Sequence, residues 1–270
     1  MIERDKIISL EECARRIRLN IIKIGYKAGK NGAHFGGCLS LAEVLAVLYS
    51  SFVYYDKDNL ESRDRVILSK GHAALALYCA LYERGLISEE DLNSFEQNGS
   101  DYVAHSKKNL MKGQEFYGGS LSLGLSYAVG VARACRLKGL NNRVYSILGD
   151  GELNEGLIWE AIMSAGHYHL NNLIIIIDHN HLQADGTIEK VMDTAPLKEK
   201  LVAFGLDVLN VNGHSVSEIY EALSQERKDC PLAIIAETVK GKGVSFMENK
   251  AKWHHGSLNE VRYAKALEEL

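Results

Sequence analysis

The stretch LGDGELNEGLIWEA, residues 148–161, marks a place where an apolar segment stops at an acid and a helical pattern begins. The segment before it, RVYSIL (143–148), is short and mostly apolar, and a second such segment, NLIIIID (172–178), follows one helix-length later. Short continuous apolar runs are typical of strands buried on both faces, and the amphipathic residues 155–169 between them predict a helix. The pattern therefore predicts two parallel strands joined by a helical crossover.

The same alternation continues along the rest of the chain. Further strands are predicted at 65–68, 207–211 and 232–239, and further helices at 69–85, 124–139, 195–204 and 215–228. Two more helices are predicted to open at capping boxes, Ser9 with Glu12 and Ser40 with Glu43. Strands alternating with helices predict an α/β fold, a doubly wound, mostly parallel sheet with helices on both faces, in a single domain spanning 1–270.

Composition excludes several classes of protein. The chain has 270 residues, of which 46% are hydrophobic and 24% charged, and a net charge of −4, which gives no reason to expect nucleic acid or an anionic membrane as partner. Its charged N-terminus lacks the apolar centre of a secretory signal, and its longest apolar run, LIIII (173–177), is too short to span a bilayer. The five cysteines form no CxxC pair, which favours a reducing, cytoplasmic environment.

Polar residues follow the two central strands at the point where each one ends. Asp150 follows the first strand, while Asp178 and Asn180 close the second. Parallel strands bring their carboxyl ends to one edge of the sheet, where open α/β sheets bind ligands. Gly149 and Gly151 allow a tight turn, and the helix beginning near Asn154 points its positive end there. Hard oxygen ligands suit Mg²⁺ completed by phosphate oxygens, so we expect a divalent ion clamping a diphosphate, with Asp178 in a structural role.

Several longer segments carry a family resemblance. The sequence GDG followed after about thirty residues by an Asn-containing segment is similar to the thiamine diphosphate fingerprint. RDRVILSKGHAALALYCALYERG, RVYSILGDGELNEGLIWEA, DHNHLQADG and VKGKGVSFMENKAKWHHG all resemble the amino-terminal, diphosphate-binding half of transketolase. The resemblance covers nearly the whole chain. Because a full-length transketolase is more than twice as long, the chain resembles the N-terminal subunit of a split transketolase.

The resemblance implies a role for individual residues. Asp150 and Asn180 would bind Mg²⁺ through their side chains and Leu182 through its carbonyl, while Gly151 would contact the diphosphate. The remaining implied positions are Gly119 and Leu121 beside the cofactor's rings, His72 at the diphosphate and reaction centre, His34 and His105 at sugar hydroxyls, His255 near the cofactor and the reacting carbons, and Glu155 at an interface between subunits. His254 is the alternative to His255, because the two are adjacent in an irregular loop.

The chain also departs from the family pattern. Phe35 stands where the family has proline after His34, Ser122 and Leu123 replace a Gly-Gln pair, and GSLNE replaces the family's Ala-Pro pattern after His255. The last two changes border the substrate channel, so the donor is expected to differ from a standard pentulose phosphate. His167, His169, His179, His181 and His214 receive no role.

The resemblance implies ketol transfer between a ketose, phosphorylated or otherwise modified, and an aldose or aldehyde acceptor. Its cofactors would be thiamine diphosphate and Mg²⁺, with Ca²⁺ or Mn²⁺ as substitutes. The family's activator of the cofactor is a glutamate in a separate pyrimidine-binding domain, which this chain lacks. We therefore expect the partner to be a C-terminal transketolase subunit, in an α2β2 assembly that is active only when both chains are present.

Other functions remain open at this stage. The α subunit of a 2-oxo acid dehydrogenase shares the fingerprint, but SKGHAA and KGKGVSFMEN resemble transketolase instead. A 1-deoxyxylulose-5-phosphate synthase would keep both domains in one chain. The remaining alternative is a binding module without catalytic activity.

Overall fold

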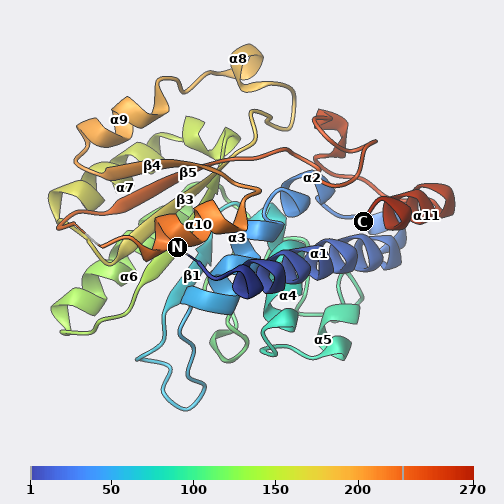
Figure 1. The fold of residues 1–270 in the computed structure, drawn as a ribbon, viewed down its shortest axis with the longest axis horizontal. Helices are drawn as coiled ribbons and strands as arrows, with labels where there is room; N and C mark the ends of the chain where they lie inside the picture. The colour runs from blue at the N-terminus through green and yellow to red at the C-terminus, as the bar shows by residue number, and fades with distance from the viewer. Residues whose placement is uncertain (1, 227) are drawn as a thin grey trace.

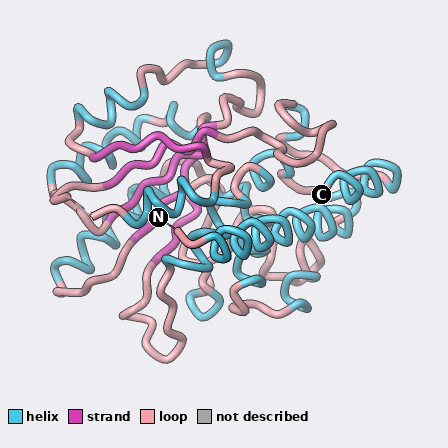
Figure 2. Tube along the Cα trace, in the orientation of Figure 1, coloured by secondary structure: helices cyan, strands magenta, loops and turns pink. Residues whose placement is uncertain are grey.

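A parallel sheet between two layers of helices forms the body of the molecule (Figure 1, Figure 2). The computed structural model describes residues 2–226 and 228–270. The strands in these residues are β1 (Arg65–Leu68), β2 (Val144–Gly149), β3 (Leu173–His179), β4 (Asp207–Asn212) and β5 (Leu232–Glu237). Their order is β1-β2-β3-β5-β4, and every pairing is parallel. The predicted α/β, doubly wound sheet is confirmed.

The α-helices of the described residues vary greatly in length. They are α1 (Arg4–Lys27), α2 (Phe35–Leu39), α3 (Ala42–Val47), α4 (Ala74–Glu83), α5 (Glu89–Asn93), α6 (Leu123–Leu137), α7 (Gly156–His167), α8 (Ile188–Val191), α9 (Leu197–Ala203), α10 (Val216–Ser224) and α11 (Glu260–Glu269). None of these helices has the length and apolar character that crossing a membrane requires.

Side-chain alternation in the strands divides the core into two parts. In β3, Ile174 and Ile176 pack with the helices α1, α3, α4 and α10, whereas Ile175 and Ile177 pack with α6, α7 and α9. Successive side chains of a strand point to opposite faces, so a run of four isoleucines serves both layers at once. The same alternation decides which residues at the end of β3 point to which layer.

Neither predicted capping box forms. Helix α1 begins at Arg4, before Ser9, and no side chain caps it. Helix α3 begins at Ala42, with Leu41 at its N-cap. The carboxylate of Glu43 instead accepts hydrogen bonds from Arg18 at 2.5 Å and from Nδ1 of His214 at 3.0 Å. Pairing with Arg18 and His214 stabilises the buried carboxylate of Glu43 more than a capping hydrogen bond would. The predicted Ser40–Glu43 capping box therefore does not form.

A buried ion pair fastens the carboxyl edge of the sheet. The ammonium of Lys70, just after β1, donates to the carboxylate of Asp178 on β3, and the two side chains are 1% and 0% exposed. The same carboxylate accepts from the hydroxyls of Ser40, at 2.6 Å, and Thr238. Burial alone would raise the pKa of Asp178, but the charge and hydrogen bond of Lys70 outweigh this and lower it. Asp178 thus connects four segments that are distant in sequence.

Replacing Asp178 with alanine should leave the buried Lys70 ammonium without its counter-charge. We expect Asp178→Ala to lower the free energy of unfolding by about 3–5 kcal/mol, and the double variant Lys70→Met/Asp178→Leu to be more stable than Asp178→Ala. Urea unfolding measures both. The control is Lys138→Ala, which breaks the exposed pair with Glu61 and should cost less than about 1 kcal/mol. Equal costs for Asp178→Ala and Lys138→Ala would contradict the role of the pair.

Candidate functional site

A cavity of about 300 Å³ lies at the carboxyl edge of the sheet, beyond β1, β2 and β3. It is lined by residues from loops after all three strands and from the loops before α2 and α6 and after β5. The lining residues are His34, Gly37, Lys70, His72, His105, Gly119, Leu121, Gly149, Asp150, Gly151, Glu152, Asn180, Leu182, Gln183, Ala184, Asp185, Lys240 and His254. All the sequence-predicted site residues except His255 and Glu155 line this one cavity.

Asp150 is held rigidly at the end of β2. Its carboxylate is almost fully buried, and its Oδ2 accepts a hydrogen bond from the backbone N–H of Asn180 at 2.7 Å. Its Oδ1 accepts from Nδ1–H of His179 at 2.5 Å. Because β2 and β3 are paired side by side, these bonds link the ends of neighbouring strands. The carboxylate is therefore fixed at the wall of the cavity.

Asn180 and Leu182 place two more oxygens beside Asp150. The side-chain oxygen of Asn180 accepts from the N–H of Leu182 at 3.2 Å, while its amide donates to Asp178 at 3.2 Å. The carbonyl of Leu182 accepts from Nζ of Lys240 at 3.2 Å, so one cationic group already contacts this oxygen. A carboxylate, an amide oxygen and a carbonyl form the hard donor set that Mg²⁺ uses. The residues present fit a divalent ion.

Lys240 brings a buried ammonium group to the cavity wall. Its side chain is 3% exposed, and its ammonium donates to the carbonyls of Leu182 and Gln183 and to Nδ1 of His254. No carboxylate among the described residues forms an ion pair with it. Burial, followed by the charge of Lys70, lowers the pKa of Lys240 to about 8. Lys70 is already paired with Asp178, so it is the Lys240 ammonium that favours an anion such as a diphosphate in this cavity.

Gly151 offers a backbone donor at the same place. It opens a 3-10 turn, Gly151–Asn154, and the first N–H groups of such a turn have no acceptor within it. A helix was expected to begin near Asn154, but α7 begins at Gly156, after this turn. Gly151 and Glu152, the first residues of the turn, line the cavity beside Asp150.

Five histidines gather beside the cavity, and four of them line it. The ring of His34 lies centrally, with ring centroids 5.4 Å from His72, 5.5 Å from His105, 5.4 Å from His254 and 4.6 Å from His255. Its Nδ1 is buried without a hydrogen-bond partner among the described residues. A buried ring nitrogen without a protein partner at a cavity leaves a position for a hydrogen bond to a ligand or to water.

The shared burial of these rings keeps several of them neutral. Burial, followed by the neighbouring histidines, lowers the pKa of His34 to about 3. Burial and Lys240 lower the pKa of His254 to about 4, and burial lowers that of His72 well below its ordinary value. A neutral imidazole has one N–H that donates a hydrogen bond and one ring nitrogen that accepts one.

The structure places His254 and His255 differently. His254 lines the cavity and contacts Lys240, whereas His255 is not among the lining residues and packs its ring against His34. Both rings therefore contact His34, but only His254 also lines the cavity. Which of the two acts on a ligand stays a prediction.

Four charged residues that line the cavity received no role from the sequence: Lys70, Glu152, Asp185 and Lys240. The buried Glu152 carboxylate accepts from the hydroxyl of Ser69 at 2.5 Å and from the N–H of Ser122 at 2.8 Å, and burial raises its pKa. Lys70 and Lys240 stand inside SKGHAA and VKGKG, two segments that carried the resemblance, so that signal could have found them.

At position 122, where the family has glycine, serine occupies an unfavourable backbone conformation. Its φ is 74°, a left-handed backbone conformation that glycine adopts without strain. A serine at this position is strained, and the hydrogen bond from its N–H to Glu152 holds the backbone in place.

Comparison with known proteins places the chain among thiamine diphosphate enzymes. The family model described as "Transketolase, thiamine diphosphate binding domain" matches residues 10–269. The chain is 38% identical over 270 residues to an apulose-4-phosphate transketolase subunit of Phocaeicola vulgatus, covering 98% of this chain and 95% of the relative. It is 40% identical over 268 residues to the 6-deoxy-6-sulfo-D-fructose transketolase subunit SqwG of Clostridium sp., covering 97% and 96%.

Full-length transketolases match over less than half of their length. Human transketolase is 35% identical over 273 residues, covering 99% of this chain and 43% of the human protein. The crystal structure of transketolase from Campylobacter jejuni superposes with a TM-score of 0.88 at 32% identity, covering 97% of this chain and 42% of that one. The chain thus corresponds to a whole subunit in the first relatives and to one part of a longer chain in the others.

The neutral histidines predict how stability depends on pH. The folded-state pKa values of His34 and His254, about 3 and 4, lie below the ordinary value of 6.5. The unfolded chain therefore binds more protons in this window, and stability is lost as pH falls below about 6.5. We expect the Tm of the wild type to fall more between pH 7.5 and 5.5 than that of His34→Asn/His254→Asn.

His167→Asn is the matched control for this measurement, because His167 is exposed at the end of α7. It should keep the wild-type response to pH. The same fall in Tm for all three proteins would show that the two rings are not the groups responsible.

Proposed function

This chain belongs to the transketolase family, as its thiamine diphosphate-binding domain, and we propose that it is one subunit of a ketol transferase. The observation that carries the proposal is its match to 95% or more of subunit relatives, against 43% of a full-length transketolase. The reaction would move a two-carbon ketol unit from a ketose to an aldose or aldehyde. Relatives named for apulose 4-phosphate and 6-deoxy-6-sulfo-D-fructose support a modified ketose as donor.

The Asp150 end of the cavity would hold the diphosphate and its metal. Asp150, Asn180 and the carbonyl of Leu182 would bind Mg²⁺, with Ca²⁺ or Mn²⁺ as substitutes, and Gly151 N–H would contact the diphosphate. Thiamine diphosphate, when bound, supplies the electron sink that carbon–carbon cleavage requires. The chain's own contribution is a fixed carboxylate, a buried positive charge and backbone donors that orient an anion.

The histidines would handle protons on the sugar. Neutral His34 can exchange a hydrogen bond with a sugar hydroxyl through its unpaired Nδ1, and His105 lies beside it. His72 and either His254 or His255 would hold or move a proton near the reacting carbons. Gly119 and Leu121 would border the cofactor's rings. A neutral imidazole offers one N–H donor and one unprotonated nitrogen, so each ring can orient a sugar hydroxyl by donating or accepting a hydrogen bond.

A partner chain would complete the site. The naming of the relatives as subunits supports one, and we propose that it carries the pyrimidine-binding domain and that the two chains form an α2β2 assembly. Residues 1–270 would then act as one diphosphate-binding domain, in the cytoplasm. Glu155, exposed at the start of α7, would lie at the interface. The α subunit of a 2-oxo acid dehydrogenase is not favoured by these relatives.

Asp150→Ala should remove the single formal negative charge of the proposed Mg²⁺ ligands. We expect the activity of the assembled enzyme to fall at least about a hundredfold, with weaker binding of thiamine diphosphate, as for the loss of a preorganised charged group. Asp101→Ala is the control, since the Asp101 side chain is 68% exposed and pairs with Lys107 alone among the described residues. Activity of Asp150→Ala near that of Asp101→Ala, at ordinary Mg²⁺ concentration, would overturn the assignment.

Alanine variants of the histidines should separate proton handling from metal binding. We expect His72→Ala and His255→Ala each to lower turnover by about 10²–10⁴ while changing Mg²⁺ affinity little. His254→Ala is measured beside them, because His254 lines the cavity. If His254→Ala lowers turnover and His255→Ala does not, the acting ring is His254; if none of the three does, the proposed roles are wrong.

A further inference from the structure

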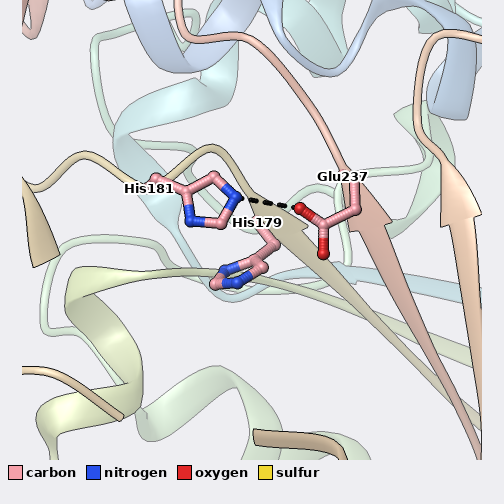
Figure 3. A group of neighbouring side chains, drawn as sticks. All are labelled: His179, His181 and Glu237. Atoms are coloured by element: carbon pink, nitrogen blue, oxygen red, sulfur yellow. Dashed lines mark hydrogen bonds and ion pairs between the residues drawn. The ribbon is translucent and has the colours of Figure 1, made fainter. Parts of the chain in front are cut away.

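A second group of potential metal ligands lies outside the cavity. His179 and Glu237 are register partners at the ends of β3 and β5, so their side chains point to the same face of the sheet. His181 follows two residues later; its ring faces the Glu237 carboxylate, and the His179 ring lies beside the pair (Figure 3). One ligand atom from each residue lies within 4.8 Å of the others, and none of the three lines the cavity.

The ligand atoms of the three residues lie near one another. Nε2 of His181 lies 2.9 Å from Oε2 of Glu237, the ring centroids of His179 and His181 are 4.1 Å apart, and the three ligand atoms are all within 4.8 Å of one another. Zinc ligands at about 2.0–2.2 Å in tetrahedral geometry lie about 3.3 Å from each other. To bind one ion, the ligand atoms must therefore approach one another by up to about 1.5 Å. The half-exposed His181 and Glu237, 49% and 43%, can make such shifts.

His179 is oriented for metal binding by Asp150. Its Nδ1–H donates to Oδ1 of Asp150 at 2.5 Å, so the lone pair of the neutral ring lies on Nε2. Metal-binding histidines commonly donate their other ring N–H to a carboxylate, which fixes the ring and increases its basicity. An ordinary surface pair between His181 and Glu237 would explain one contact. It would not explain an oriented third ring on the same side.

We propose that His179, His181 and Glu237 bind a divalent transition-metal ion of the zinc class, with water in the fourth position. Two imidazoles and one carboxylate suit zinc and disfavour Mg²⁺ and Ca²⁺, which prefer oxygen ligands only. On binding, the proton of His181 Nε2 moves to its other ring nitrogen, and the Glu237 carboxylate offsets part of the ion's charge. The site is distinct from the oxygen ligands Asn180 and Leu182, and it does not depend on the proposed enzymatic function.

The test is direct metal binding to the full chain. The protein is stripped with a chelator and dialysed against Zn²⁺, and bound zinc is measured; Co²⁺ is then added to report geometry by visible absorption. We expect one Zn²⁺ per chain at this site and a tetrahedral Co²⁺ spectrum. His181→Ala and Glu237→Gln, both at exposed positions, should weaken Zn²⁺ binding at least about tenfold and abolish that spectrum.

Two histidine controls locate the ion. His167→Ala removes an exposed ring elsewhere, and His34→Ala removes the central ring of the cavity; both should bind Zn²⁺ as the wild type does. Asp150→Ala should weaken Zn²⁺ binding by about ten- to a hundredfold, through loss of the partner that orients His179. Absence of Zn²⁺ binding, or binding that His34→Ala removes and His181→Ala leaves intact, would overturn the proposal.

Discussion

The buried pair of Lys70 and Asp178 is the constraint on which the carboxyl edge of the sheet depends. Asp178 also accepts hydrogen bonds from Ser40 and Thr238, so the pair joins the loop after β1, the segment between α2 and α3, the end of β3 and the segment after β5. An uncompensated charge in such a place would be strongly destabilising, which makes the arrangement of these four segments specific. The cavity wall is built directly on this junction, since Lys70 also lines the cavity.

Strand alternation gives the two acids at this edge different tasks. Asp178 points to the layer of α1, α3 and α4, where its carboxylate accepts buried hydrogen bonds and is not part of the cavity. Asp150, one strand away, keeps its carboxylate at the cavity wall. The same alternation turns His179 toward the opposite layer from Asp178, where it meets Asp150 and Glu237. The end of β3 thus directs Asp178, the structural acid, to one layer and His179 to the other. Asp150 lies between the cavity and the His179–His181–Glu237 group.

Sequence patterns predicted all five strands of the described residues and the polar strand ends at Asp150 and Asn180, because buried parallel strands and their polar ends are encoded locally; Leu182 was implied by the family resemblance alone. They failed where tertiary pairing decides. Ser40 was expected to cap a helix, but its hydroxyl donates to Asp178, which lies 138 positions away. The pairing of Lys70 with Asp178 and the isolation of Lys240 inside the cavity are equally non-local. The choice between His254 and His255 depends on the conformation of an irregular loop, which no periodic pattern specifies.

The central claim is that this chain supplies the diphosphate-binding half of an active site that a partner completes. The most direct measurement is ketol transfer by this chain and a companion chain carrying a pyrimidine-binding domain, purified separately and assayed before and after mixing. The account predicts turnover only in the mixture, and only with Mg²⁺ and thiamine diphosphate present. Full turnover by this chain alone, in a preparation shown to be free of the companion, would contradict it.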